Sequence, residues 1–278
     1  MVGVILTFFG SLFEEISSSI GKKEVSKLEE DVYTMGFLSI LWPVLFFAII
    51  IFFIRGQFIF SWDSWPTFLT RAILEVIEAH CALIALTKTD RTTFSFVRLL
   101  TLPLLLLVDL ILGYALKLPQ LLGITLIVVS LSLLLFKQGI NKKGIGWVVF
   151  ISLNAVATIS LYKYDITHFN SVETEQFLIC SILFIYFFFL ILWLDKKNPF
   201  RLLGRPLFLA QSLIGGAGGV LTGFAYNFTS ASIATTAKRS SAIIWSMVSG
   251  GLYFHERQLI FKISILSLLI GGLILLIL

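Results

Sequence analysis

The residues best suited to chemistry in this 278-residue chain are two adjacent cations, Lys238 and Arg239. Both lie deep inside the apolar stretch 231–252, where a charge must face a bundle interior or a wet cavity. Small polar residues surround them: Ser232, Thr235, Thr236, Ser240 and Ser241. Because arginine offers a planar donor fork and lysine a point charge, the pair favours recognition of an anion or carboxylate.

Acids in other apolar stretches give a second interpretation, in which these cations only hold the bundle together. Glu14 and Glu15 lie in the stretch 2–20, and Glu75 and Glu78 lie in 67–87. Under this alternative each cation forms an internal ion pair with one of these acids. The predicted substrate-binding set contains Lys238, Arg239, Thr235, Ser241, Arg98 and Asn154.

Glu75 and Glu78 are three positions apart and share one face of a predicted helix. Two neighbouring carboxylates in a low-dielectric setting raise each other's pKa toward neutrality, where they can bind and release protons. The candidates for proton coupling are therefore Glu75, Glu78, Glu14 and Glu15. The alternative is that these acids are permanently neutralised by bases. Arg71 and Glu75 are placed for an i,i+4 ion pair. Arg71 and Asp109 are also near helix ends, so we expect both to reach the membrane surface.

Composition predicts the setting of these residues. The chain is 58% hydrophobic and 13% charged, which excludes a water-soluble enzyme or a nucleic-acid-binding protein. A membrane-crossing helix needs about 20 mostly apolar residues. Ten stretches qualify: 2–20, 33–54, 67–87, 92–114, 118–136, 145–162, 175–194, 206–228, 231–252 and 259–278. We therefore expect an all-α integral membrane protein with ten transmembrane helices, in which only 21–32, 55–66 and 163–174 form loops of about a dozen residues.

Basic residues predict the orientation. The loops after the odd-numbered stretches hold fourteen Lys and Arg, whereas the opposite side holds only Arg55, Lys117 and Lys163. The positive-inside rule therefore places both termini outside the cytoplasm, in a multi-pass protein of the cell membrane.

The chain also aligns weakly with itself. A shift of 141 residues places Arg98 on Arg239 and Leu118 on Leu259. Five stretches then fall in each half, 1–140 and 141–278, and an odd number reverses the membrane orientation of the second half. Inverted repeats of this kind are typical of transporters, with the substrate site near the midplane between the halves.

The second half resembles a known family. The segment Ser230–Ser241, the segment Gly250–Arg257 (Gly-Gly-Leu-Tyr-Phe-His-Glu-Arg) and the apolar last stretch resemble EamA-type drug/metabolite transporters. This resemblance implies ten helices in two inverted repeats of five. In the phosphate-translocating branch of that superfamily, a Lys-Arg pair in the ninth helix binds the substrate phosphate, which implies that role for Lys238 and Arg239. Two features depart from the family pattern. In the first half, Ala115 occupies the position equivalent to Glu256, and family members usually have cytoplasmic termini, the reverse of the orientation predicted here.

Glycines form a ridge at spacing four, Gly215, Gly219 and Gly223, which predicts close helix packing.

We expect no catalytic residues, metal or other cofactor, because the enzyme motifs considered are incomplete. After His255-Glu256, for example, Leu259 stands where a second zinc ligand would be needed. The expected partners are a small-molecule substrate and the lipid bilayer, without nucleic acid; proton coupling and a homodimer stay open. The alternatives to a secondary transporter are an intramembrane enzyme acting on a lipid-phosphate head group and a non-transporting assembly factor.

Overall fold

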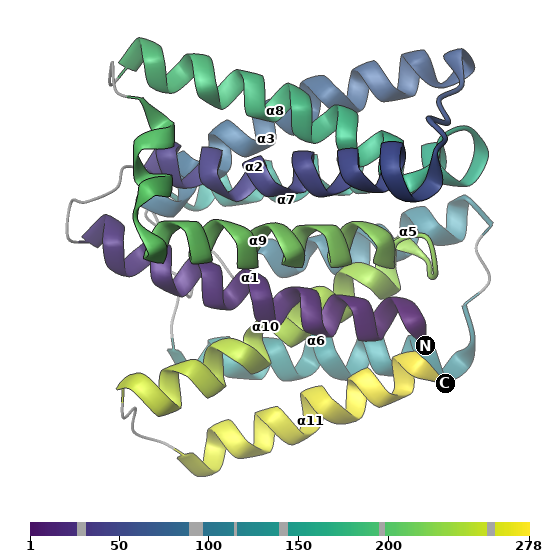
Figure 1. The fold of residues 1–278 in the computed structure, drawn as a ribbon. Coiled ribbons are helices and arrows are strands. Elements are labelled where there is room, and N and C mark those ends of the chain that lie inside the picture. Colours follow the sequence, from purple (N-terminus) through teal and green to yellow (C-terminus); the bar gives the residue numbers. More distant parts are fainter. Residues whose placement is uncertain (27–31, 89–96, 114–115, 139–143, 195–197, 255–258) are drawn as a thin grey trace.

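The protein, seen here as a computed structural model, is a bundle of α-helices (Figure 1). The structure describes residues 1–26, 32–88, 97–113, 116–138, 144–194, 198–254 and 259–278. Within these residues the α-helices are α1 (Val2–Ser26), α2 (Val32–Ile49), α3 (Trp65–Lys88), α5 (Thr101–Ile111), α6 (Leu118–Gln138), α7 (Ile145–His168), α8 (Val172–Leu194), α9 (Pro206–Ala225), α10 (Ala231–Phe254) and α11 (Leu259–Ile277). No strand occurs among them, so the all-α prediction is confirmed.

Five segments are long and apolar enough to cross a membrane: Val2–Ile20, Gly36–Arg55, Ile145–His168, Val172–Leu194 and Pro206–Ala225. The last turn of the second one is a π-helix, Ile50–Arg55, that continues α2. Large apolar side chains cover the outside of the bundle; Phe53 is 84% exposed and Trp193 is 77% exposed. An apolar exterior of this kind is costly in water and suits a lipid environment.

The helix ends follow from local chemistry. Gly56 ends the π-helix in a left-handed conformation (φ 65°), which a side chain would disfavour. Pro206 opens α9, where its missing N–H costs nothing. Ser171 caps α8 by accepting a hydrogen bond from the backbone N–H of Thr174 at 3.3 Å.

The prediction of a twelve-residue loop at 163–174 is wrong. Helix α7 continues to His168 and α8 begins at Val172, so the connection is only three residues long. Lys163 and Asp165, expected in a loop, are therefore helical and buried.

Helices α1 and α10 lie in the middle of the bundle (Figure 1). Helix α1 packs against both α9 and α10, while α2 packs on α8, α3 on α7 and α6 on α11. The first seven residues of α10, 231–237, are all buried, as expected of a helix surrounded by others. The two chain termini lie at the same end of the bundle (Figure 1).

Glycines set the closest approach between helices. Gly215 lies against Ser17 of α1, whereas Gly219 and Gly223 lie against Pro43 and Phe47 of α2. Two other glycines of α9 also make tight contacts: a Cβ added to Gly218 would lie 2.7 Å from the carbonyl oxygen of Gly10. A Cβ on Gly216 would similarly overlap the Trp42 side chain, so these two positions bring α1 and α2 into backbone contact with α9.

Candidate functional site

Lys238 forms an ion pair with Glu14. Its Nζ lies 3.0 Å from Glu14 Oε1, and this oxygen also accepts a hydrogen bond from the Thr222 hydroxyl at 3.1 Å. The Ser11 hydroxyl donates to the backbone carbonyl of Lys238. The pair thus joins α1, α9 and α10 across 224 positions of sequence.

Both partners remain accessible although they point into the bundle. Glu14 lies on the face of α1 that carries the buried residues Thr7 and Ser11, opposite the exposed residues Phe9 and Ile16. Even so, the side chains of Lys238 and Glu14 are 34% and 33% exposed. The exposed surface of both side chains therefore lies on the side of α1 that faces the bundle.

Arg239 is held differently. Its Nε donates to the Thr101 hydroxyl of α5 at 2.9 Å. Among the residues that the structure describes, no carboxylate forms an ion pair with it. A half-buried guanidinium bound to one neutral hydroxyl retains donors for an anion.

Thr235 lies between the two cations on the same face of α10, three positions before Lys238 and four before Arg239. Its hydroxyl contacts the Tyr226 hydroxyl at 3.0 Å. Ser241 is buried as well, and its hydroxyl has no hydrogen-bond partner within the described ranges. Thr235 thus shares a helix face with both cations, whereas Ser241 lies two positions after Arg239 and on the opposite side of α10 from it.

Arg98 and Glu78 form a second ion pair in the interior. Arg98 Nη2 lies 3.3 Å from Glu78 Oε1, and the Thr158 hydroxyl of α7 donates to the other Glu78 oxygen at 3.2 Å. Both side chains are partly exposed, at 25% for Arg98 and 14% for Glu78. Nearby, the Asn154 amide donates to the backbone carbonyl of Leu74 at 2.8 Å, which ties α7 to α3.

The other candidates for proton coupling have different surroundings. Glu75 lies 3.5 Å from Arg71, so the predicted i,i+4 pair is confirmed. Glu15 accepts a hydrogen bond from Ser19 of its own helix at 3.4 Å. The structure thus brings Glu14 to Lys238 and Glu78 to Arg98, while Glu75 pairs with Arg71 and joins a network around that residue.

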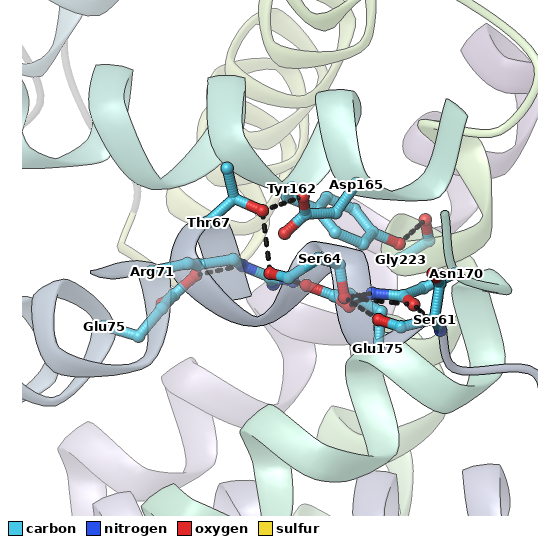
Figure 2. A network of polar contacts seen from close by, with 10 residues as sticks. All are labelled: Ser61, Ser64, Thr67, Arg71, Glu75, Tyr162, Asp165, Asn170, Glu175 and Gly223. Carbon is cyan, nitrogen blue, oxygen red and sulfur yellow. Dashed lines mark hydrogen bonds and ion pairs between the residues drawn. The ribbon is translucent and has the colours of Figure 1, made fainter. Parts of the chain in front are cut away.

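Apart from the Arg71–Glu75 pair, this network (Figure 2) was not predicted from the sequence. Arg71 Nη1 lies 2.9 Å from Glu175 Oε1, and the second Glu175 oxygen accepts from the Asn170 amide at 2.7 Å. Asn170 in turn accepts from the backbone N–H of Ser61 at 2.9 Å, and its amide donates to Ser64 at 3.0 Å. The contacts join the α2–α3 connection and α3 to α7 and α8, at the end of the bundle where the termini lie (Figure 1).

The expectation that Arg71 and Asp109 reach the membrane surface is wrong. Arg71 is 2% exposed, with Tyr162 4.2 Å below its guanidinium. Asp109 is 1% exposed and accepts the backbone N–H of Ser232 at 2.7 Å, which places a carboxylate at the start of α10. Both charged side chains therefore have their binding partners inside the protein, and neither reaches the membrane surface.

A helix-start signal was available for the missed acids. Ser171 followed by the acids Glu173 and Glu175 is typical of a capped helix with a negative first turn. That pattern places Glu173, which was expected in the loop 163–174, inside the helix, and it places Glu175 in the first turn.

Comparison with protein-family models finds no match, and comparison with curated proteins finds none either. Ala115 and residues 255–258, which belong to the proposed family resemblance, lie outside the described residues.

Proposed function

We propose that this chain is a secondary transporter of the drug/metabolite type, which moves a small polar metabolite across the cell membrane by alternating access. The observation that carries the proposal is Arg239, a guanidinium in the middle of the bundle that pairs with no described carboxylate. A guanidinium in that position without a carboxylate in direct contact is costly, so we expect an anionic group of the substrate to be its partner. Lys238 and Thr235 flank the same space.

The helix packing supports two inverted repeats of five helices, 1–140 and 141–278. In chain order, the equivalent helices of the two halves are α1 and α7, α2 and α8, α3 and α9, α5 and α10, and α6 and α11. When each helix is replaced by its equivalent, the α1–α9 contact becomes the α7–α3 contact, and α2–α9 becomes α8–α3. The contacts α2–α8, α5–α10 and α6–α11 each join a helix to its own equivalent, so the replacement leaves them unchanged. In addition, α3 and α9 begin at Trp65 and Pro206, and α6 and α11 begin at Leu118 and Leu259, each pair 141 residues apart.

The accessible charges lie between these halves, as a carrier requires. Glu14 belongs to the first half and Lys238 to the second, and Thr101 and Arg239 are divided in the same way. A rocking motion of one half against the other would change these contacts directly. Binding of an anion at Arg239 can therefore favour one conformation of the carrier over the other.

The buried Arg71–Glu175 network supports a conformation that is closed at the end carrying the termini. The Lys and Arg count places that end outside the cytoplasm, so the interior charges are reached from the cytoplasmic side. In the opposite conformation, the network would open and the cytoplasmic end would close.

Uptake into sealed proteoliposomes tests this function. Purified protein is reconstituted and exposed to a panel of labelled metabolites that includes phosphate esters and carboxylates, while the same panel is incubated with protein in detergent. A transporter accumulates at least one compound unchanged inside the vesicles, and Arg239→Ala abolishes this uptake. Consumption of a compound in detergent, without vesicle uptake, would instead identify an enzyme.

A further inference from the structure

The Thr67 hydroxyl has two oxygen neighbours and a single hydrogen. Its Oγ1 lies 2.9 Å from the backbone carbonyl oxygen of Ser64 and 2.5 Å from Asp165 Oδ1 (Figure 2). The Thr67 hydroxyl is placed to donate to either oxygen, and its one hydrogen cannot serve both contacts at full strength. A proton on the Asp165 carboxyl group would supply the second hydrogen, so that Asp165 donates to Thr67 while Thr67 donates to Ser64.

Burial and charge lead to the same requirement. Asp165 is 0% exposed, and its Oδ2 has no hydrogen-bond partner within the part of the chain that the structure describes. The charged groups that act on it are Arg71 of α3 and Glu175 of α8. Arg71 is engaged by Glu175 at 2.9 Å and by Glu75 at 3.5 Å, and among the residues that the structure describes no base forms an ion pair with Asp165.

The other surroundings of Asp165 supply no base either. On its own helix, Tyr162 donates its hydroxyl to the Gly223 carbonyl of α9 at 2.9 Å. Lys163 donates to the backbone carbonyl of Tyr226 at 2.8 Å. Within the described ranges, an ionised carboxylate in this position would be fully buried without an ion pair to a base, which is costly.

We propose that Asp165 is a proton-binding site that holds its proton while this end of the bundle is closed. The Asp165 O–H donates to Thr67 Oγ1, and the Thr67 O–H donates to the Ser64 carbonyl. When the end opens, water replaces Thr67, the Asp165 O–H bond breaks and the proton passes to water, which leaves a solvated carboxylate. The coupling of this proton to substrate movement rests on the proposed function.

A proton fits this contact better than a metal cation. Two oxygens 2.5 Å apart are at the short end of the range for an O–H···O hydrogen bond. Oxygens that share a metal ion stay further apart, because each must contact the ion at 2.0 Å or more. Asp165 is also distinct from the predicted proton-coupling candidate Glu78, which pairs with Arg98.

Infrared spectroscopy of the purified protein tests the proton directly, without transport. Wild-type protein near neutral pH should show the carbonyl-stretch band of a protonated carboxylic acid, shifted by ¹³C-aspartate labelling. Asp165→Asn should lose this band and keep its melting temperature within about 2 °C, because the amide can still donate to Thr67. Thr67→Val should move the band, since its acceptor is gone. Asp63→Asn, the same change at an exposed position, should leave it intact.

Two results of this experiment would overturn the assignment. One is the absence of a ¹³C-sensitive acid band in the wild type, which needs no variant to fold. The other is a band that remains unchanged in Asp165→Asn. Either result would show that Asp165 is ionised in the closed conformation.

Sealed proteoliposomes test the coupling. The expected result is that a pH gradient drives uptake by the wild type, whereas Asp165→Asn retains exchange and no longer responds to the gradient. Wild-type transport that ignores the gradient would overturn the coupling, even if the acid band is present. If neither protein transports any compound, the proposed function fails, while the infrared band still supports the proton on Asp165.

Discussion

The Lys238 ammonium and the Glu14 carboxylate are 3.0 Å apart, yet about a third of each side chain is exposed inside the bundle. The sequence indicates that both residues are unusual, because a charge deep in an apolar stretch is costly. It does not indicate that they are partners, because the choice among Glu14, Glu75 and Glu78 depends on which helices pack together. The same is true of Arg239, whose neighbour Thr101 was not a candidate.

The Lys238–Glu14 pair can be tested by a double-mutant cycle. Lys238→Ala leaves Glu14 without its cation, and we expect a loss of about 1–3 kcal/mol, less than for a fully buried pair because water reaches the acid. The Glu14→Gln/Lys238→Ala double variant should recover most of the loss. Thermal unfolding in detergent measures both effects. Equal and additive losses from the two changes would show that the ion pair contributes nothing to stability.

The helices are the level at which the sequence is most informative. Each of the ten apolar stretches contains one α-helix in the described residues, because hydropathy marks the segments that lipid can surround. The polar end of α7 was misjudged for the same reason: Lys163 and Asp165 lower the local hydropathy, although the chain stays helical to His168. Burial of that end, and with it the network around Arg71, depends on neighbouring helices that a single stretch does not reveal.

The glycines of α9 provide a prediction with an internal control. Gly218→Ala should destabilise the protein by about 1–3 kcal/mol, because its Cβ would lie 2.7 Å from the Gly10 carbonyl oxygen and force α1 away. Gly219→Ala places its Cβ at an ordinary 3.6 Å from Pro43 and should be neutral or slightly stabilising, since alanine favours helix. Thermal unfolding of the two variants decides this. Similar losses in both would contradict the contact assigned to Gly218.

At the scale of the whole molecule, several helix contacts have a counterpart when the two proposed halves are exchanged, and charged side chains from both parts of the chain meet in the middle. The sequence suggests the repeat through its spacing, but sequence identity between the halves is too low to establish which helices are equivalent. The contacts make that correspondence testable.

The orientation of the molecule gives a separate prediction. Fourteen Lys and Arg lie in the loops on one side, so a reporter fused after Leu278 should be found outside the cytoplasm. Two reporters that work on opposite sides of the membrane, such as a phosphatase and a fluorescent protein, measure the location of the carboxyl terminus in cells. Fluorescence without phosphatase activity would place the carboxyl terminus in the cytoplasm and reverse the assignment of the closed end.

Counterflow in sealed proteoliposomes tests the central claim most directly. Vesicles are loaded with an unlabelled anionic metabolite that the uptake panel has identified, and entry of the labelled compound is followed with no ion gradient. A carrier whose interior site contains Arg239 should exchange label rapidly. Arg239→Ala should abolish exchange without a loss of thermal stability, and Arg239→Lys should reduce it strongly because the bidentate fork is lost. Full exchange by Arg239→Ala, or no exchange by the wild type in tight vesicles, would contradict the account.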